Sequence, residues 1–385
     1  MRRRRWILAG AAGAALLAIV LVLVLSGGGG HERRPPPKPR ADHGLEIALQ
    51  DNAVFLERKY YDRDVALGQA RQMGVSWMRT NLLWARVEPS PGRFDWSQYD
   101  SLVDAARKAG MSVEMSLTGP APAWATGNAQ RGVFRPDPVK FGALARAAAE
   151  HFNGRVPRYS IWNEPNFISW LRPLDEAPGI YRRLYQAGWA AVKGVDPRAQ
   201  VLIGETAAYA KRGRALAPLA FLHQVACRGC PQLHADGYAH HPYEFTDPPE
   251  SSYPGSGNVT IGTLDRLTRS LDSLARDRLL ATPRGEPLPV YLTEFGYFAS
   301  GRYALPASVR ADWLVRAYSI AERMYPRVRQ LLQYLLVAPP PSGPAADSFD
   351  TSVVARSGAP EAPFSALAAW AARERRLGRV AGSAP

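Results

Sequence analysis

The chain has 385 residues, of which 46% are hydrophobic and 10% aromatic, and its formal net charge is +14. This apolar content excludes disordered and collagen-like proteins, and two cysteines are too few to hold so long a chain together without a buried core. Residues 1–40 carry half of the net charge and the remainder has no long basic run, which argues against nucleic acid as a partner because nucleic-acid-binding proteins concentrate their charge in one stripe.

The N-terminus combines positive charge with a long apolar stretch. Arg2–Arg5 precede an uninterrupted apolar run from Trp6 to Leu25. A helix of this length spans about 30 Å, the thickness of a bilayer core, and exceeds the apolar region of a secretory signal. We predict a cytoplasmic segment (1–5), an uncleaved transmembrane signal anchor (6–25) and a Gly/Pro-rich linker (26–43). The rest of the chain would lie outside the cell membrane, and secretion after signal cleavage is the alternative.

Beyond the linker, short apolar runs alternate with segments of helical spacing. Leucines in residues 261–274 recur every three or four positions, which predicts a helix with one apolar face, and further helices are predicted for 138–151 and 306–324. Eight strand-like runs with helices between them favour an α/β fold, the (β/α)8 or TIM barrel, over residues 44–376, with an open doubly wound sheet as the alternative. Residues 377–385 are predicted to form a C-terminal tail. The eight runs are 45–49, 75–80, 111–117, 158–162, 200–205, 237–240, 290–293 and 330–336.

Three glutamates end strand-like runs. Glu164 follows Trp162-Asn163, Glu205 follows Ile203-Gly204, and Glu294 follows Leu292-Thr293. In a (β/α)8 barrel, catalytic residues from different strands converge at the carboxyl ends of those strands. Two carboxyl groups at this rim are the minimum for cleaving a glycosidic bond, one as the acid and one as the nucleophile or base. Capping of the next helix is the alternative, and for Glu205 we predict contact with substrate rather than chemistry.

The two cysteines form a C-x-x-C motif, Cys227 and Cys230. Outside the membrane this spacing predicts a local disulfide, and the alternatives are a zinc site with His223 and His234 or a redox motif. No H-E-x-x-H, P-loop or G-x-G-x-x-G motif occurs in the sequence, so we predict neither a metal nor a cofactor.

The segments Trp162-Asn-Glu-Pro165 and Thr293-Glu-Phe-Gly296 resemble the fourth- and seventh-strand signatures of clan A of the (β/α)8 retaining glycoside hydrolases. Families 5 (cellulase-like) and 39 (xylosidase-like) are the most similar. The resemblance covers about residues 44–376, because four further segments also resemble the clan. These are 78–96 with Arg79, 122–125 with Trp124, 240–243 with His241 and Tyr243, and 349–367.

The resemblance implies a role for each matching residue. Glu164 would be the general acid/base and Glu294 the nucleophile, kept ionised by hydrogen bonds from Arg79 and Tyr243. Asn163 would bind the sugar 2-hydroxyl. Two further residues, His241 and Trp124, would line the sugar pocket. An ordinary packing or ion-pairing role is the alternative for Arg79, Tyr243, His241 and Trp124.

We therefore predict a membrane-tethered, extracytoplasmic retaining glycosidase whose partner is a carbohydrate, a β-linked polysaccharide or glycoconjugate. Retention predicts that the two carboxyl groups lie about 5–5.5 Å apart, against about 6.5–9.5 Å in an inverting enzyme. One departure from the clan is the end of the eighth strand, where Tyr334 or Leu336 would replace the usual tryptophan. This departure leaves open a catalytically silent glycan-binding scaffold, and a transglycosidase using the same residues is a further alternative.

Overall fold

The structure is a computed structural model that describes residues 43–252, 254–341 and 349–382. The predicted cytoplasmic segment, the signal anchor and all but the last residue of the linker lie outside these ranges. Of the helices within them, none combines the length and the hydropathy needed to cross a bilayer.

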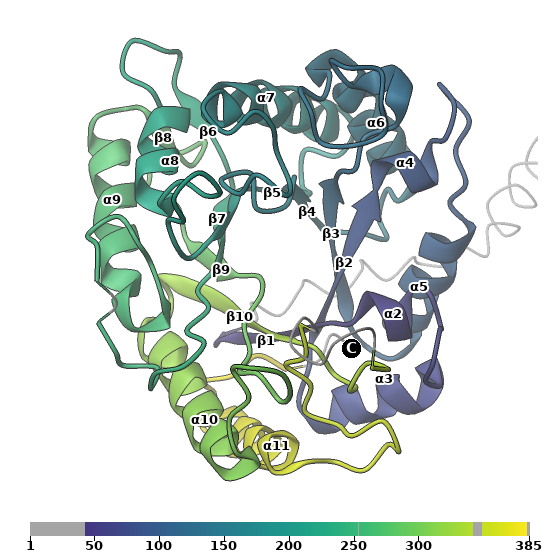
Figure 1. Ribbon diagram of the computed structural model, residues 1–385, viewed down its shortest axis with the longest axis vertical. Helices are drawn as coiled ribbons and strands as arrows, with labels where there is room; N and C mark the ends of the chain where they lie inside the picture. Colours follow the sequence, from purple (N-terminus) through teal and green to yellow (C-terminus); the bar gives the residue numbers. More distant parts are fainter. Residues whose placement is uncertain (1–42, 253, 342–348, 383–385) are drawn as a thin grey trace, which may run out of the picture. The chain divides into compact units, whose positions relative to one another are not determined.

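Within the described residues, eight parallel strands close into a barrel (Figure 1). Their order around the barrel is β1-β10-β9-β7-β5-β4-β3-β2. The (β/α)8 prediction is thus confirmed and the open doubly wound sheet is excluded. The strands are β1 (Glu46–Gln50), β2 (Trp77–Leu83), β3 (Ser112–Thr118), β4 (Arg158–Ile161), β5 (Gln200–Ala207), β7 (Gly237–His241), β9 (Val290–Leu292) and β10 (Val328–Tyr334).

Helices follow the barrel strands and surround them (Figure 1). A separate two-stranded parallel sheet pairs β6 (Leu233–His234) with β8 (Leu280–Ala281), and short helical turns occur in the loops. The longer helices are α3 (Arg63–Gln72), α5 (Ser97–Lys108), α6 (Pro138–His151), α7 (Ala177–Val195), α8 (Pro218–Val225), α9 (Leu264–Arg276), α10 (Ala307–Arg323) and α11 (Ala362–Arg376). The short turns are α2 (Asn52–Phe55), α4 (Trp84–Val87), η1 (Ala123–Ala125) and η2 (Ile261–Thr263).

The helices form where apolar spacing and end signals agree. In α9 the four leucines predicted to share a face are all buried. The side chain of Asp137 caps α6 by accepting hydrogen bonds from the backbone of Val139 and Lys140, and Pro138 occupies the first turn, where its missing N–H costs nothing. The predicted helices at 138–151 and 306–324 are confirmed to within one residue at each end.

The segment after α11, predicted to be a tail, returns to the barrel. Val380 forms a parallel bridge with Leu45, just before β1, and both side chains are buried. The Leu45 amide donates to the Arg379 carbonyl at 2.8 Å, and the Ala381 amide donates to the Leu45 carbonyl at 3.0 Å. Residues 379–381 therefore belong to the barrel domain.

The interior of the barrel is polar as well as apolar. The Arg158 guanidinium lies between the rings of Trp77 and Tyr291, 3.6 and 4.3 Å from their centroids. The buried Glu114 carboxylate lies 3.4 Å from Arg158 and 3.8 Å from Arg79. Buried charges persist only where they are paired, and Glu114 lies between Arg158 and Arg79 in the barrel interior.

Candidate active site

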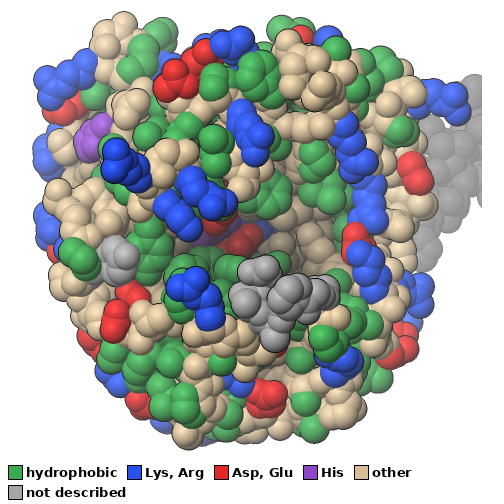
Figure 2. All heavy atoms as spheres, in the orientation of Figure 1, with side chains coloured by type: hydrophobic (Ala, Val, Ile, Leu, Met, Phe, Trp, Pro, Cys, Tyr) green, Lys and Arg blue, Asp and Glu red, His purple; other side chains and the backbone are tan. Residues whose placement is uncertain are grey.

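A cavity of about 470 Å³ lies at the carboxyl ends of the barrel strands. Glu164, after β4, and Glu294, after β9, both line it. In the space-filling view the cavity is a hollow with acidic side chains at its floor (Figure 2). The two carboxylates whose sequence motifs singled them out are therefore brought to one site.

Glu294 is held by the two residues that the resemblance implied. One guanidinium nitrogen of Arg79 donates to Glu294 Oε1 at 2.9 Å, and the Tyr243 hydroxyl donates to Oε2 at 3.3 Å. Burial raises the pKa of Glu294, while the positive charges of His241 and Arg79 oppose that rise. These two cations are what favour the ionised form that a nucleophile requires.

Asn163 lines the same cavity beside Glu164. Its Oδ1 accepts a hydrogen bond from Arg79 Nη2 at 3.2 Å. Because the carbonyl end of the amide is engaged in this way, its NH₂ end is the donor that remains for a ligand. This arrangement suits the sugar-binding role that the resemblance implied.

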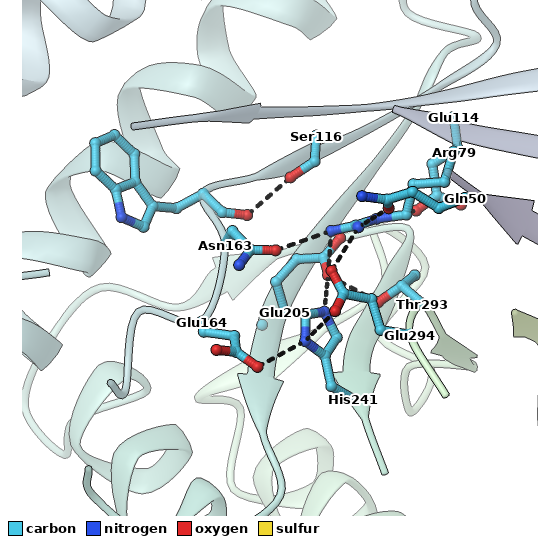
Figure 3. Close-up of polar contacts among 12 residues, drawn as sticks. Gln50, Arg79, Glu114, Ser116, Asn163, Glu164, Glu205, His241, Thr293 and Glu294 are labelled. Carbon is cyan, nitrogen blue, oxygen red and sulfur yellow. Dashed lines mark hydrogen bonds and ion pairs between the residues drawn. The ribbon is translucent and has the colours of Figure 1, made fainter. Parts of the chain in front are cut away.

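Glu164 contacts a histidine beneath the cavity. Its Oε1 lies 3.1 Å from His241 Nδ1 (Figure 3). One oxygen of Glu164, one of Glu294 and a ring nitrogen of His241 all lie within 4.8 Å of one another. The two carboxylates therefore face each other at short range.

An irregularity in β5 sets the position of Glu164. The register between β5 and β7 shifts between Gly204 and Thr206, so Glu205 lies in a bulge with φ +51°. Gly204 has φ +116°, and a Cβ there would lie 2.5 Å from the Ala239 carbonyl oxygen, so no other residue fits. The Glu164 amide donates to the Glu205 carbonyl at 2.8 Å. Bulges commonly re-aim side chains beside active sites, and here the bulge anchors the Glu164 backbone.

Glu205 does not contact the cavity, which corrects the prediction that it touches substrate. Its side chain is 0% exposed and accepts hydrogen bonds from Arg79 at 3.0 Å, His241 Nε2 at 2.7 Å and the Thr293 hydroxyl at 2.7 Å. Burial tends to raise the pKa of Glu205, but Arg79 and His241 outweigh burial and lower it to about 2. Glu205 is thus an ionised counter-charge beneath the two catalytic candidates.

His241 also lies beneath the cavity rather than lining it, which corrects a second prediction. Its side chain is 0% exposed and lies between Glu164, Glu205 and Glu294 (Figure 3). Burial alone would lower the pKa of His241, but Glu294 and hydrogen bonds to Glu164 and Glu205 raise it to about 10. A protonated imidazole has no lone pair for a metal, so this cluster is better suited to charge balance than to metal binding.

The two adjacent histidines should respond to pH in opposite ways. His241 has a folded-state pKa raised from 6.5 to about 10, so its stabilising contribution is complete below pH 6.5 and is lost as pH rises through 10. His240 is buried, which lowers its pKa to about 3. The contribution of the neutral His240 side chain to the stability of the folded protein is therefore complete above pH 6.5 and is lost as pH falls toward 3.

We therefore expect the melting temperature difference between the wild type and His241→Gln to shrink between pH 7 and pH 10. The matched control, His240→Gln, should show a constant difference over that range and a shrinking one below pH 6.5. Calorimetry across this pH range checks both. Parallel profiles for the two variants would contradict the charge assignment of His241.

Trp124 lies outside the cavity, which corrects its prediction as a sugar platform. Its ring packs edge-on against Trp84 with centroids 5.9 Å apart, and its Nε1 donates to the Pro89 carbonyl at 3.3 Å. It lines a separate surface depression with Phe94 and Lys140. The tryptophan of the loop after β3 therefore packs against the segment that follows β2.

Tyr334, at the end of β10, lines the cavity. It is one of the two residues expected to replace the tryptophan of the clan, while Leu336 is fully buried. Phe349 packs edge-on against the Tyr334 ring with centroids 5.7 Å apart. The cavity thus keeps an aromatic wall at this strand end.

Other residues of the cavity were missed in the sequence. Gln50, at the end of β1, accepts a hydrogen bond from Arg79, and its position at a strand end could have indicated it. Two more of the missed residues belong to defined elements, Asn81 to β2 and Asn52 to the short turn α2. The others come from loops, where no periodic signal exists, and include Phe167, Trp170, Lys211 and Phe245.

Cys227 and Cys230 are joined by a disulfide in the loop after α8. The two histidines considered as zinc ligands are engaged elsewhere. His223 Nε2 lies 2.8 Å from the Ser270 hydroxyl, and His234 Nδ1 lies 3.4 Å from the Thr282 carbonyl oxygen. The motif therefore closes a short loop at a distance from the cavity.

Comparison with known proteins agrees with the barrel fold. Residues 57–129 match the model of a glycoside hydrolase family, family 42, described as β-galactosidase. No curated protein matches the sequence. The family match covers β2 and β3 of the barrel with the helices α3, α4 and α5.

Solved structures extend the similarity to the whole barrel. A family 39 glycoside hydrolase from Bacteroides cellulosilyticus WH2 aligns with a TM-score of 0.67 and 20% identity, over 86% of this chain and 64% of that one. A GH39 β-xylosidase from Caulobacter crescentus aligns with a TM-score of 0.57 and 17% identity, over 87% of this chain and 72% of that one. A GH5_18 protein from Streptomyces cattleya, in complex with GlcNAc, aligns with a TM-score of 0.58 and 17% identity, over 87% of this chain and 81% of that one. The chain thus spans less than two thirds of the first of these proteins, and its predicted resemblance to families 5 and 39 is confirmed.

Proposed function

We propose that the protein is a retaining glycoside hydrolase that cleaves β-linked O-glycosidic bonds in a polysaccharide or glycoconjugate. The observation that carries the proposal is the approach of Glu164 and Glu294 to within 4.8 Å, atom to atom, across the cavity. An inverting enzyme needs about 6.5–9.5 Å between its carboxyl groups to admit a water molecule, whereas a retaining enzyme needs about 5–5.5 Å. The short separation therefore supports direct attack by one carboxylate.

In the first step, Glu294 attacks the anomeric carbon while Glu164 gives its proton to the leaving oxygen. The glycosidic C–O bond breaks, and the sugar becomes an ester of Glu294. Glu164 Oε1 is engaged by His241, so Oε2 is the oxygen that carries the proton toward the cavity. The Asn163 NH₂ group is placed to bind a sugar hydroxyl, a contact that strengthens as positive charge develops on the ring.

In the second step, Glu164 acts as the base. It takes a proton from a water molecule, whose oxygen attacks the anomeric carbon and breaks the ester to Glu294. Two displacements restore the original configuration and both carboxyl groups. Arg79 and Tyr243, which hydrogen-bond Glu294, stabilise it again as it leaves as a carboxylate.

We also propose that this chemistry takes place outside the cell, with the barrel tethered to the membrane. The support is the apolar run 6–25 with arginines before it and a Gly/Pro-rich linker after it. A polymer or surface glycan is a substrate that a tethered enzyme can reach.

Covalent trapping tests the proposal. The full chain in detergent is incubated with a panel of 2-deoxy-2-fluoro β-glycosides bearing good leaving groups, and the intact mass is measured. We expect one glycosyl adduct, which peptide mapping places on Glu294 and which is lost in Glu294→Gln. A matched variant of an exposed glutamate, Glu286→Gln, should be labelled like the wild type.

The outcome also separates the alternatives. Release of the sugar to water with retained configuration supports the hydrolase. Release only to an added sugar acceptor would indicate a transglycosidase. No adduct and no turnover with any sugar would contradict the proposal and favour a glycan-binding scaffold.

A further inference from the structure

Three basic side chains gather in a tight hairpin between β5 and α8. Lys211, Arg212 and Arg214 are all exposed within residues 211–215, called the basic hairpin below. The amide of Lys211 donates to the carbonyl of Ala215 at 3.0 Å, and the amide of Ala215 donates to the carbonyl of Lys211 at 2.8 Å. These reciprocal backbone bonds close the turn, so the three cations are presented on a defined backbone.

The basic hairpin is fixed to the segment that carries Glu164. Ala215 forms an antiparallel bridge with Phe167, and the Ile168 amide donates to the Arg214 carbonyl at 2.8 Å. The Phe167 amide in turn donates to the Glu164 carbonyl at 2.9 Å. The cations thus stand on the general-acid side of the cavity, the side on which the leaving group of a glycoside must lie because Glu164 protonates its oxygen.

Two of the cations of the basic hairpin lie at the cavity: Lys211 lines it, and the Arg214 guanidinium lies over the ring of Phe167, 5.9 Å from its centroid. The other charged side chains that line the cavity are Glu164 and Glu294. Within the part of the chain that the structure describes, Lys211, Arg212 and Arg214 have no ion-pair partner. Figure 2 shows Lys and Arg side chains gathered along one edge of the hollow.

Some arginines elsewhere on the molecule do have ion-pair partners. Arg316 is paired with both Glu250 and Asp312, and Arg327 with Asp272. Clustered cations that have no ion-pair partner repel one another and are stabilised by a bound anion, and they also raise the local concentration of anionic ligands. Charge-assisted hydrogen bonds from Lys and Arg to carboxylate, sulfate or phosphate are among the stronger polar contacts in proteins.

We propose that the leaving-group side of the cavity binds an anionic sugar residue, so that the substrate is an acidic glycan carrying carboxylate, sulfate or phosphate groups. The sugar rings would lie against the aromatic wall of Phe167 and Trp170, which line the cavity on the same side, while the anionic group meets Lys211 and Arg214. This proposal rests on the proposed glycosidase function and narrows its substrate class.

Binding of matched glycans tests it. The full chain in detergent, carrying Glu294→Gln so that nothing is turned over, is titrated calorimetrically with cellotetraose and with its C6-oxidised counterpart. These differ only in four carboxylates. A second matched pair, xylotetraose and its sulfated form, provides sulfate. We expect the anionic member of a pair to bind at least about tenfold more tightly, with the preference falling as NaCl rises from about 0.05 M to about 0.5 M.

Two double variants show whether the basic hairpin is responsible. Lys211→Gln with Arg214→Gln should abolish the preference, whereas Arg71→Gln with Lys108→Gln, which removes the same charge from the exposed ends of α3 and α5, should retain it. Equal affinity for both members of each pair, or no measurable binding to any, would overturn the proposal. So would tighter binding of an oligothymidylate of equal charge, since that would indicate a nucleic-acid site.

The binding test and the covalent trapping can have independent outcomes, so failure of the acidic-glycan proposal can be told from failure of the proposed function. Trapping with small, neutral fluoroglycosides reports on Glu294 and is carried out on the wild type, and the Arg71→Gln/Lys108→Gln variant, which lies away from the cavity, should be labelled at the wild-type rate. Labelling without an anion preference would contradict only the acidic-glycan proposal. An anion preference without labelling would contradict the glycosidase.

Discussion

Replacing Glu294 by alanine is expected to lower kcat/KM for an aryl β-glycoside by about 10⁴-fold or more, because the covalent route loses its nucleophile. Glu164→Ala should lower it far less for substrates with good leaving groups, which need no proton. With poor leaving groups the loss should reach about 10²–10⁴-fold. Steady-state rates over a series of aryl leaving groups measure both effects.

Added azide separates the two roles. With Glu164→Ala, azide should attack the glycosyl ester of Glu294 and yield a glycosyl azide of retained configuration. With Glu294→Ala, azide can enter only where the nucleophile was and should yield the inverted azide. Inverted azide from both variants would contradict the assignment of Glu294, and rescue of neither would contradict the double-displacement route.

Replacing Glu205 by glutamine is expected to lower the free energy of unfolding at pH 7 by about 3–5 kcal/mol, because Arg79 and His241 lose a buried counter-charge. Glu205 is 0% exposed, and both cations contact its Oε2. We also expect activity to fall, since the same cations position Glu294 and Glu164. Urea unfolding and kcat/KM measure the two effects.

The matched control is Glu114→Gln. Glu114 is equally buried and also lies beside Arg79, but burial raises its pKa, whereas that of Glu205 is lowered to about 2. The neutral side chain should therefore cost much less at position 114 than at position 205.

The pH dependence of the Glu205 effect follows from its lowered pKa. A carboxylate with a folded-state pKa of about 2 against an ordinary 4.5 contributes stability that is present above pH 4.5 and lost as pH falls through 2. The difference between the wild type and Glu205→Gln should shrink over that interval. A constant difference, or an equal cost for Glu114→Gln at pH 7, would contradict the role of Glu205 as counter-charge.

Much of the fold could be predicted from local patterns. The leucines of α9 and the Asp137–Pro138 start of α6 are encoded within single segments, and the structure agrees with them. The alternation of apolar runs and helices favoured a closed barrel over an open doubly wound sheet, and the structure shows the closed barrel. What local patterns could not show is that the chain after α11 returns to pair with Leu45, because that contact joins distant segments.

The residues of the site were likewise predictable only in part from local sequence. The sequence alone placed Glu164 and Glu294 at strand ends, and from a shared rim it follows that they meet, as they do. Glu205 ends the predicted run 200–205, yet β5 continues to Ala207, and Glu205 lies in a one-residue register shift with its side chain beneath the cavity. Whether a strand-end side chain faces substrate or lies under it depends on that shift, which alternation of residue types does not encode.

By itself, therefore, the sequence favoured the barrel and placed the two carboxylates at its rim, while the contacts of Arg79 and Tyr243 to Glu294 were implied only by the family resemblance. Only the tertiary structure decided that His241 and Glu205 form a buried layer of charge below them, and that the basic hairpin stands beside the loop of Glu164. The physical reason is that the pKa of a buried group and the partner of a loop depend on neighbours from other strands and loops. Those neighbours become adjacent only when the barrel closes.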